Sequence, residues 1–146
     1  MALAPVNSTP SHGPGLRLLS LDGGGVRGLS SLLILQKLME NIDHKHPPKP
    51  CDYFDMIGGT STGGLIAIML GRLRMTVQEC IDEYLELCPK IFTKTKKRLS
   101  MQGTIQGKFD HIALEVGVRS ILRKRGIDEN ALLKDDSAES DNNCKT

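Results

Sequence analysis

The chain has 146 residues, a formal net charge of +2 and a low aromatic content, with three Phe, two Tyr and no Trp. This length suits one domain at most, and so small a charge excludes nucleic-acid binding as the expected function. The longest apolar run, residues 65–70, is much shorter than the roughly twenty residues that a membrane-spanning helix requires. The four cysteines have no Cys-x-x-Cys spacing, so the sequence predicts reduced thiols and neither a metal site nor a disulfide framework.

Residues 1–15 are rich in proline, serine and glycine and lack the apolar segment of a signal peptide. We expect a flexible leader there, with the domain itself starting at residue 16. Residues 16–21 are mostly apolar and end before an Asp-Gly sequence, which is typical of a short buried strand. Apolar side chains then cover most of the circumference of a helix over residues 29–40, so this helix is predicted to be largely buried.

A proline-rich connection, residues 44–50, leads to a second predicted strand, residues 53–57. A strand, a helix and a strand in this order predict a right-handed crossover between two parallel strands. The carboxyl ends of parallel strands lie at the same edge of a sheet. The segment after the first strand is therefore expected beside the segment after the second, whatever chemistry the two carry.

Two helices are predicted after the second strand. The first covers residues 63–70 and is too apolar to face solvent. The second opens with a capping box formed by Thr76 and Glu79. We expect it to end near residue 88, because Pro89 follows.

The last third of the chain is more polar. Residues 94–108 are basic and contain glycine, so they are expected to form a surface loop. A further helix is predicted over residues 110–125, with Asp110 at its N-cap and Gly126 at its end. Residues 134–146 are expected to be a solvent-exposed connection.

Each of the two predicted strands is followed by a glycine-framed motif. The second motif, G-G-T-S-T-G-G over residues 58–64, contains the pattern G-x-S-x-G, formed by Gly59, Ser61 and Gly63. This pattern is typical of a serine on a sharp turn between a strand and a helix, where the residues two positions away must be small. Ser61 is therefore the candidate nucleophile.

The first motif, L-S-L-D-G-G-G-V-R-G over residues 19–28, provides a run of glycine N–H groups at the start of a helix. Such groups, unshielded by side chains, can stabilise the oxyanion that forms when a serine attacks an ester carbonyl. The expected oxyanion hole consists of the loop glycines and the residue after the nucleophile: Gly23, Gly24, Gly25 and Thr62. Asp22 is interpreted as a cap for backbone N–H groups. Together the two motifs predict a hydrolase.

The segments L-S-L-D-G-G-G-V-R-G and F-D-M-I-G-G-T-S-T-G-G-L resemble those of the patatin-like phospholipase family, in the same order and at a similar separation. The resemblance runs from residue 16 to about residue 126 and includes features shared with the catalytic domains of cytosolic phospholipase A2. It implies a three-layer α/β/α fold with parallel strands. It also implies hydrolysis of lipid acyl esters by a Ser–Asp dyad, without a histidine or a cofactor. The substrate would be a glycerolipid or phospholipid, met by a cytoplasmic protein in transient contact with a membrane surface.

The same resemblance implies roles for individual residues. Ser61 matches the nucleophile, and residues 23–28 match the oxyanion loop. Arg27 lies where the family has a basic residue, which would stabilise this loop or bind a phosphate head group. The other motif positions are Gly28, Gly59 and Gly63.

The aspartate of the dyad is missing from this sequence. In the family it lies in an Asp-Gly-Gly or Asp-Gly-Ala motif on a later strand, and no Asp after Ser61 is followed by glycine. We therefore interpret residues 16–146 as the N-terminal part of a catalytic domain, truncated before its Asp, with further domains expected beyond it. Such a chain is expected to be inactive by itself, because a serine hydroxyl needs a base to become nucleophilic. A non-catalytic family member is the alternative.

Two other interpretations remain open. Residues 23–28 also fit G-x-G-x-x-G, the pattern of a phosphate-binding or nucleotide-binding module. Against this, a proline-rich connection stands where that module has an acidic residue, about twenty residues later. His111 is the only histidine after Ser61 and is therefore a candidate base, but its expected place in the first turn of a helix favours a surface or capping position.

Overall fold

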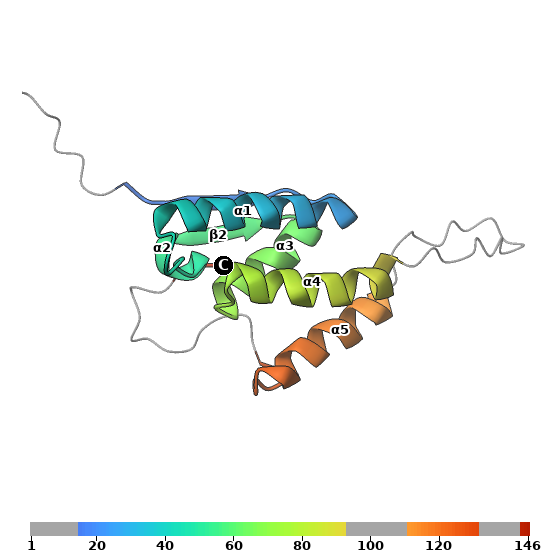
Figure 1. Ribbon diagram of the computed structural model, residues 1–146. Coiled ribbons are helices and arrows are strands. Elements are labelled where there is room, and N and C mark those ends of the chain that lie inside the picture. The colour runs from blue at the N-terminus through green and yellow to red at the C-terminus, as the bar shows by residue number, and fades with distance from the viewer. Residues whose placement is uncertain (1–14, 93–110, 132–143) are drawn as a thin grey trace, which may run out of the picture.

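The computed structural model describes residues 15–92, 111–131 and 144–146 (Figure 1). Most of the predicted leader, the predicted loop at residues 94–108, Asp110 and the side chain of His111 lie outside the described residues. The elements in chain order are β1 (Leu18–Leu21), η1 (Gly25–Arg27), α1 (Gly28–Ile42), α2 (Pro50–Tyr53), β2 (Met56–Gly59), α3 (Thr62–Ala67), η2 (Ile68–Arg72), α4 (Val77–Phe92) and α5 (His111–Lys124).

The two strands are parallel, as predicted. Leu18 pairs with Met56 and Leu21 pairs with Gly59, so both strands end at the same edge of the sheet. The amide of Thr60 extends the ladder by donating to the carbonyl of Leu21 at 3.1 Å. This register places the glycine loop after β1 directly beside the serine turn after β2.

The second strand begins at Met56, and its predicted start at residue 53 is wrong. Residues 50–53 form the short helix α2, in which Tyr53 is the last residue. Lys49 before it is extended, and Pro50 occupies the first turn, where the fixed φ of proline suits a helix start. The amide of Phe54 closes the turn by donating to the carbonyl of Pro50 at 2.8 Å.

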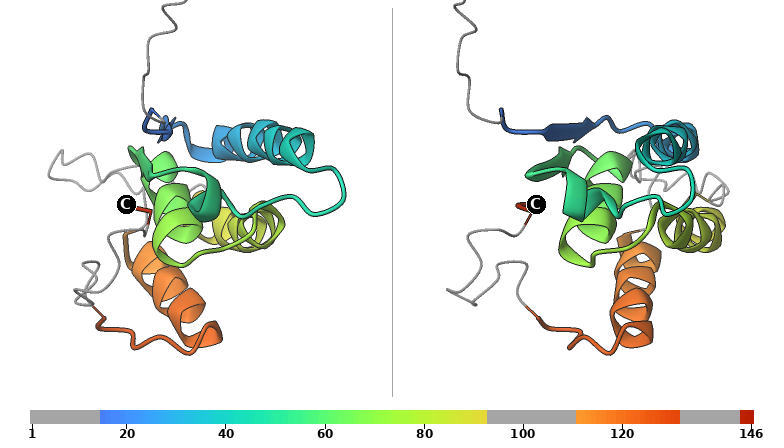
Figure 2. Two further views of the ribbon diagram at one scale, coloured as in Figure 1. Left: turned by 90° about the vertical axis from the view of Figure 1, so that its left-hand side faces the viewer. Right: turned by 60° about the vertical axis from the view of Figure 1, so that its left-hand side comes forward.

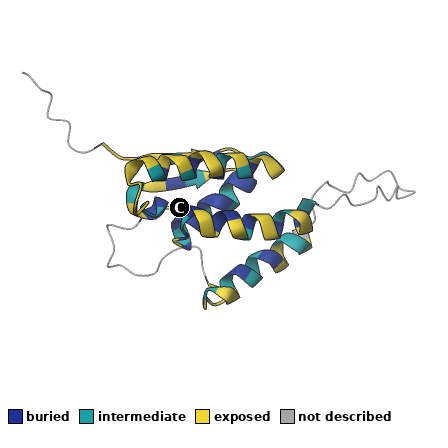
Figure 3. Cartoon of the chain, in the orientation of Figure 1, coloured by how far each residue is buried: buried dark blue, intermediate teal, exposed yellow. Residues whose placement is uncertain are grey.

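Helix α1 is only half buried, so the prediction of a largely buried helix is wrong. Leu32, Leu35 and Met39 are buried, where α1 packs on α3 and α4. Ile34 and Leu38 are 71% and 45% exposed, and Figure 3 shows much of α1 in the colour of exposed residues. Apolar residues occur on both sides of α1, but the described residues pack against only one of these sides.

Helix α4 begins with the predicted capping box. The Glu79 carboxylate accepts a hydrogen bond from the amide of Thr76 at 2.7 Å, and the Glu79 amide donates to Thr76 Oγ1 at 3.1 Å. The hydrogen bond from the Thr76 amide lowers the pKa of Glu79. Each partner thus satisfies a backbone group that the helix itself leaves unpaired.

Pro89 does not end α4, contrary to the prediction. The helix continues to Phe92 with Pro89 inside it. Leu87 and Ile91, on either side of the proline, are buried in the core. Their packing holds the last turn in place, which shows tertiary contacts outweighing a local helix breaker.

Helix α5, His111–Lys124, confirms the helix predicted over residues 110–125. It ends before Gly126, which has a φ of +68°, and the amide of Ile127 closes the end by donating to the carbonyl of Leu122 at 2.9 Å. Lys124 at its last turn reaches Glu86 of α4 at 2.7 Å. Hydrogen bonds from Lys124 and Lys90 lower the pKa of Glu86 to about 2.

The described residues form an α/β fold in which α1 and α3 lie on the same side of the sheet (Figure 2). On the other side, Leu18 and Met56 are exposed to solvent. The structure therefore describes the sheet and one helical layer of a partial domain.

The end of the predicted exposed connection, residues 134–146, is exposed at Lys145 and Thr146 but also pairs with the sheet. Lys145 forms a parallel bridge with Met56, next to β2. The amide of Ile57 donates to the carbonyl of Lys145, and the amide of Lys145 donates to the carbonyl of Asp55, both at 2.9 Å. Residues 144–146 thus extend the sheet beyond β2, whereas residues 134–143 lie outside the described residues.

Candidate active site

Ser61 occupies a strained turn between β2 and α3. Its φ is +52° and its ψ is −125°, in a region that residues with a side chain rarely adopt. This conformation matches the sharp strand-to-helix turn expected of a G-x-S-x-G motif. Ser61 is exposed and lies at the N-terminus of α3.

The two glycines around Ser61 have no room for a side chain. A Cβ added at Gly59 would lie 2.5 Å from the carbonyl carbon and oxygen of Gly63. A Cβ added at Gly63 would overlap the carbonyl oxygen of Leu21 and lie 2.8 Å from that of Asp22. The turn can therefore approach the end of β1 only because both positions are glycine.

Substituting Gly63 with Ala is expected to destabilise the fold by about 3 kcal/mol or more, because the clash is with backbone atoms that cannot rotate away. Gly58→Ala is the matched control, since a Cβ there has no atom within 4 Å, and its effect should stay within about 1 kcal/mol. Urea unfolding of the 146-residue chain measures both. Equal free energies of unfolding for the two variants would contradict the close approach of the turn to β1.

The threonines on either side of Ser61 bind the glycine loop. The amide of Gly23 donates to Thr60 Oγ1, and the amide of Gly24 donates to Thr62 Oγ1, each at 3.2 Å. A Cβ added at Gly23 would lie 2.8 Å from the Cβ of Ser61. The loop and the serine are thus in direct contact. The role of the two hydroxyls was not predicted from the sequence, although T-S-T is a signal that could have indicated it.

These bonds narrow the set of N–H groups that could bind an oxyanion. Gly23 and Gly24 already have threonine acceptors. The amides of Gly25 and Thr62 have no acceptor among the described residues. The same bonds are evidence against the phosphate-binding alternative, because a loop that binds phosphate needs its amides free.

Hydrogen bonds to the carbonyls of Gly24 and Gly25 also fix the backbone of the loop. The carbonyl of Gly24 accepts hydrogen bonds from the amide of Arg27 at 3.3 Å and from its Nε at 3.4 Å. The carbonyl of Gly25 accepts a hydrogen bond from the hydroxyl of Tyr84 at 2.5 Å. Because Gly25 itself has a φ of +57°, the loop turns sharply between these two carbonyls.

Tyr84 contacts the loop from α4, a role that no sequence pattern indicates. It belongs to α4 and is only 1% exposed. A Cβ added at Gly28 would overlap its hydroxyl and lie 2.9 Å from its Cζ, which explains why position 28 is glycine. Burial raises the pKa of Tyr84, so its hydroxyl stays protonated and able to donate.

An apolar cavity of about 120 Å³ opens beside Ser61. Ser61 and Thr62 line one part of it, and side chains of α3, α4 and α5 line the rest. The other lining residues are Leu65, Tyr84, Leu87, Cys88, Ile91, Phe92 and Leu114. Burial raises the pKa of the Cys88 thiol, which keeps the wall of the cavity uncharged.

The arrangement of a strained serine, a glycine loop and an apolar cavity agrees with the sequence comparison. The model of the patatin-like phospholipase family matches residues 19–143. The chain belongs to this family. The resemblance inferred from the two glycine motifs is thereby confirmed.

Several patatin-like relatives are similar over the same region. Patatin-like protein 1 of Arabidopsis thaliana is 44% identical over 95 residues, which cover 59% of this chain and 23% of that protein. Human calcium-independent phospholipase A2-gamma is 38% identical over 103 residues, covering 70% of this chain and 12% of that protein. Phospholipase A I of Arabidopsis thaliana is 36% identical over 99 residues, covering 67% of this chain and 7% of that protein. No solved structure gives a significant match. The chain thus spans less than a quarter of each of these three relatives.

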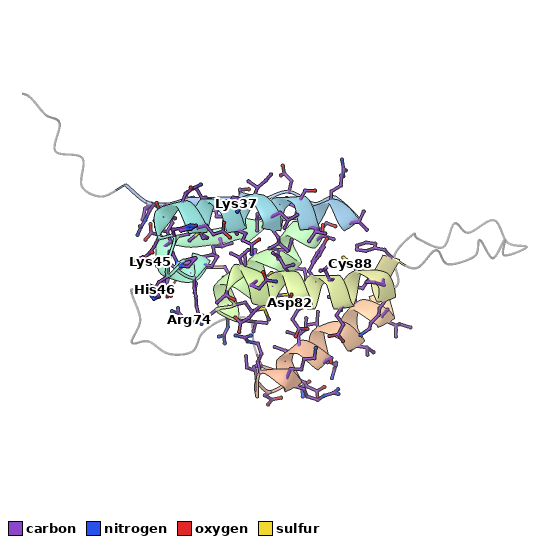
Figure 4. The ribbon with its side chains drawn as sticks, in the orientation of Figure 1. Lys37, Lys45, His46, Arg74, Asp82 and Cys88 are labelled. Carbon is purple, nitrogen blue, oxygen red and sulfur yellow. The ribbon has the colours of Figure 1, made fainter. Side chains whose placement is uncertain are left out.

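Several basic residues lie away from the patatin-like site. Lys45, His46 and Arg74 gather at the end of the molecule away from Cys88 and the cavity (Figure 4). Within the described ranges there is no cluster of side chains that could hold a metal ion, and no helix is long and apolar enough to cross a membrane.

Asp22 does not show the capping role predicted for it. Its carboxylate accepts no hydrogen bond from the residues that the structure describes, and the two threonine hydroxyls bind the neighbouring amides instead. The hydroxyl of Ser61 likewise has no carboxylate or imidazole partner among these residues. The structure therefore brings together Ser61, the loop glycines, Thr62 and Arg27, and no base from the described part of the chain contacts the serine.

Proposed function

We propose that this chain is the N-terminal part of a catalytic domain that hydrolyses acyl esters of glycerolipids or phospholipids, with Ser61 as the nucleophile. The position of Ser61 supports this most directly. It lies on a strained turn, in the wall of an apolar cavity, next to N–H groups that have no acceptor in the described part of the chain. Two relatives are named as phospholipases, one of them calcium-independent.

In the proposed reaction, Ser61 Oγ attacks the ester carbonyl carbon while its proton passes to an Asp outside this chain. The carbonyl oxygen becomes an oxyanion, which the amides of Gly25 and Thr62 stabilise. The C–O bond to the lipid alcohol then breaks, and the alcohol leaves with the proton that the Asp held. A water molecule, deprotonated by the same Asp, hydrolyses the acyl-serine to release the fatty acid and restore Ser61.

The cavity supports an acyl ester as the substrate class. Its walls beyond Ser61 are mainly aliphatic and aromatic, as expected of a site for a hydrocarbon chain. In this arrangement the acyl chain would enter between α3, α4 and α5, and the carbonyl would remain at Ser61. Arg27 would act through the loop, because its Nε already contacts the Gly24 carbonyl.

Exposed apolar side chains near the site support transient contact with a lipid surface. Val26 belongs to η1 beside the loop and is exposed. Ile112 and Val116 are exposed on α5, the helix that contributes Leu114 to the cavity. We further propose a cytoplasmic location, because all four cysteines are free thiols.

The test compares two forms of the protein. The extended form continues past Thr146 through the first Asp-Gly-Gly or Asp-Gly-Ala motif, and the other form is the 146-residue chain. Each is assayed for fatty-acid release from phospholipid vesicles and for hydrolysis of a short-chain p-nitrophenyl ester. The extended form should be active and the 146-residue chain inactive, because only the former has the base.

The control is the extended form with its added Asp changed to Asn, which should be as inactive as the 146-residue chain. Equal activity in all three proteins would contradict the Ser–Asp dyad and would point to His111 or a local aspartate as the base. An extended form that folds but hydrolyses neither substrate would contradict the proposed function.

A further inference from the structure

Several hydrogen bonds hold the backbone around Gly25, including one within η1 from the Gly28 amide to the Gly25 carbonyl. The Gly24 amide is bound to Thr62 Oγ1, the Gly24 carbonyl to Arg27, and the Gly25 carbonyl to the hydroxyl of Tyr84. The first two bonds come from within the serine turn and the loop itself. The third comes from α4, a helix 59 residues further along the chain.

This external support matters because the loop contains three consecutive glycines. Glycine has the largest backbone freedom of any residue, so a glycine loop does not hold an amide in one direction by itself. The Gly25 amide lies between the two bound carbonyls, those of Gly24 and Gly25. Without the Tyr84 hydroxyl, the Gly25 carbonyl would keep its bond to the Gly28 amide, which belongs to the same loop. The peptides on either side of Gly25 would then rotate more freely, and the direction of the Gly25 amide would vary.

Tyr84 is well placed to provide a rigid anchor. Its ring is buried in the core, and Gly28 at the start of α1 lies against it. The shortness of its hydrogen bond to the Gly25 carbonyl, 2.5 Å, indicates close contact with the loop. It also lines the same cavity as Ser61, so the anchor and the nucleophile belong to one site.

We propose that Tyr84 is a positioning residue that sets the direction of the Gly25 amide for oxyanion stabilisation, an inference that rests on the proposed function of this site. Tyr84 acts through the Gly25 carbonyl and takes no proton from the substrate. Its effect therefore belongs to the transition state, in which the oxyanion exists, and not to binding of the acyl chain.

The experiment uses Tyr84→Phe, which removes one hydroxyl and keeps the ring. Tyr53→Phe is the matched control, because Tyr53 is the other tyrosine of the chain and lies in α2, outside the cavity. In the extended form, Tyr84→Phe should lower kcat for a p-nitrophenyl ester by about tenfold or more, with KM nearly unchanged. Tyr53→Phe should leave both constants within about twofold. A role in folding alone would lower Tm without this selective fall in kcat.

A second measurement does not depend on activity. Amide hydrogen exchange at Gly24, whose N–H is bound to Thr62 Oγ1, is measured by NMR on the 146-residue chain. It should become faster in Tyr84→Phe, because a less constrained loop opens this bond more often, and stay the same in Tyr53→Phe. Unchanged exchange at Gly24, or a kcat within twofold of the unmodified extended form, would overturn the proposal. Absence of any Ser61-dependent hydrolysis in the unmodified extended form would instead refute the proposed function, while the exchange rates would still show whether Tyr84 anchors the loop.

Discussion

Substituting Ser61 with Ala should lower kcat of the extended form on lipid esters by about 10⁴-fold or more, because the variant lacks the atom that forms the acyl bond. The fold should be unaffected, with a free energy of unfolding within about 0.5 kcal/mol of the original. The positive φ at position 61 is as unfavourable for alanine as for serine. The substitution therefore leaves the backbone strain of the turn unchanged.

The measurement is fatty-acid release from phospholipid vesicles, together with urea unfolding. Ser20→Ala is the control, because Ser20 is an exposed serine of β1 outside the cavity. That variant should keep full activity. Turnover by Ser61→Ala above the level of a blank would show that another group attacks the ester.

Gly25→Ala is expected to lower kcat by about a hundredfold or more, the usual effect of losing one oxyanion donor. A Cβ at this position would meet only the ring of Phe92, at 3.7 Å, so the new methyl group does not collide with the protein. The effect arises from the backbone, because a φ of +57° is unfavourable for alanine. The loop would relax toward negative φ and turn its amide away from the substrate.

Gly126→Ala separates this effect from a general loss of stability. Gly126 has a φ of +68° and open space around its Cβ position, and it follows α5, where it takes no part in lining the cavity. The two variants should lose similar free energies of unfolding, about 1 to 2 kcal/mol each. Only Gly25→Ala should lose kcat. A similar kcat for the two variants would show that Gly25 does not contribute to an oxyanion hole.

Topology made the central geometry of this site predictable. A parallel strand, helix and strand unit requires the loop after β1 to lie beside the turn after β2, and the register of Leu21 with Gly59 shows this. The capping box of Thr76 and Glu79 was predictable as well, because both partners lie within one turn of the chain. When both partners of an interaction lie within a few residues of each other, the sequence pattern alone is enough to predict it.

The wrong predictions concern long-range contacts. The burial of α1 depends on what covers its outer side, and the end of α4 depends on how Leu87 and Ile91 pack. The role of Tyr84 was not predictable, because nothing near it in sequence indicates a bond to Gly25. Likewise, the Thr60 and Thr62 hydroxyls find their partners 37 and 38 residues away.

The most direct test of the proposed nucleophile is covalent labelling of the extended form with a fluorophosphonate ester, followed by mass spectrometry of the modified peptide. This reagent reacts with a serine only where a base activates the hydroxyl and N–H groups stabilise the phosphonyl oxygen. The proposed mechanism predicts one label, on Ser61, and no label on the Ser61→Ala variant. Absence of labelling, or a label on a different residue, would contradict Ser61 as the nucleophile of a lipid acyl hydrolase.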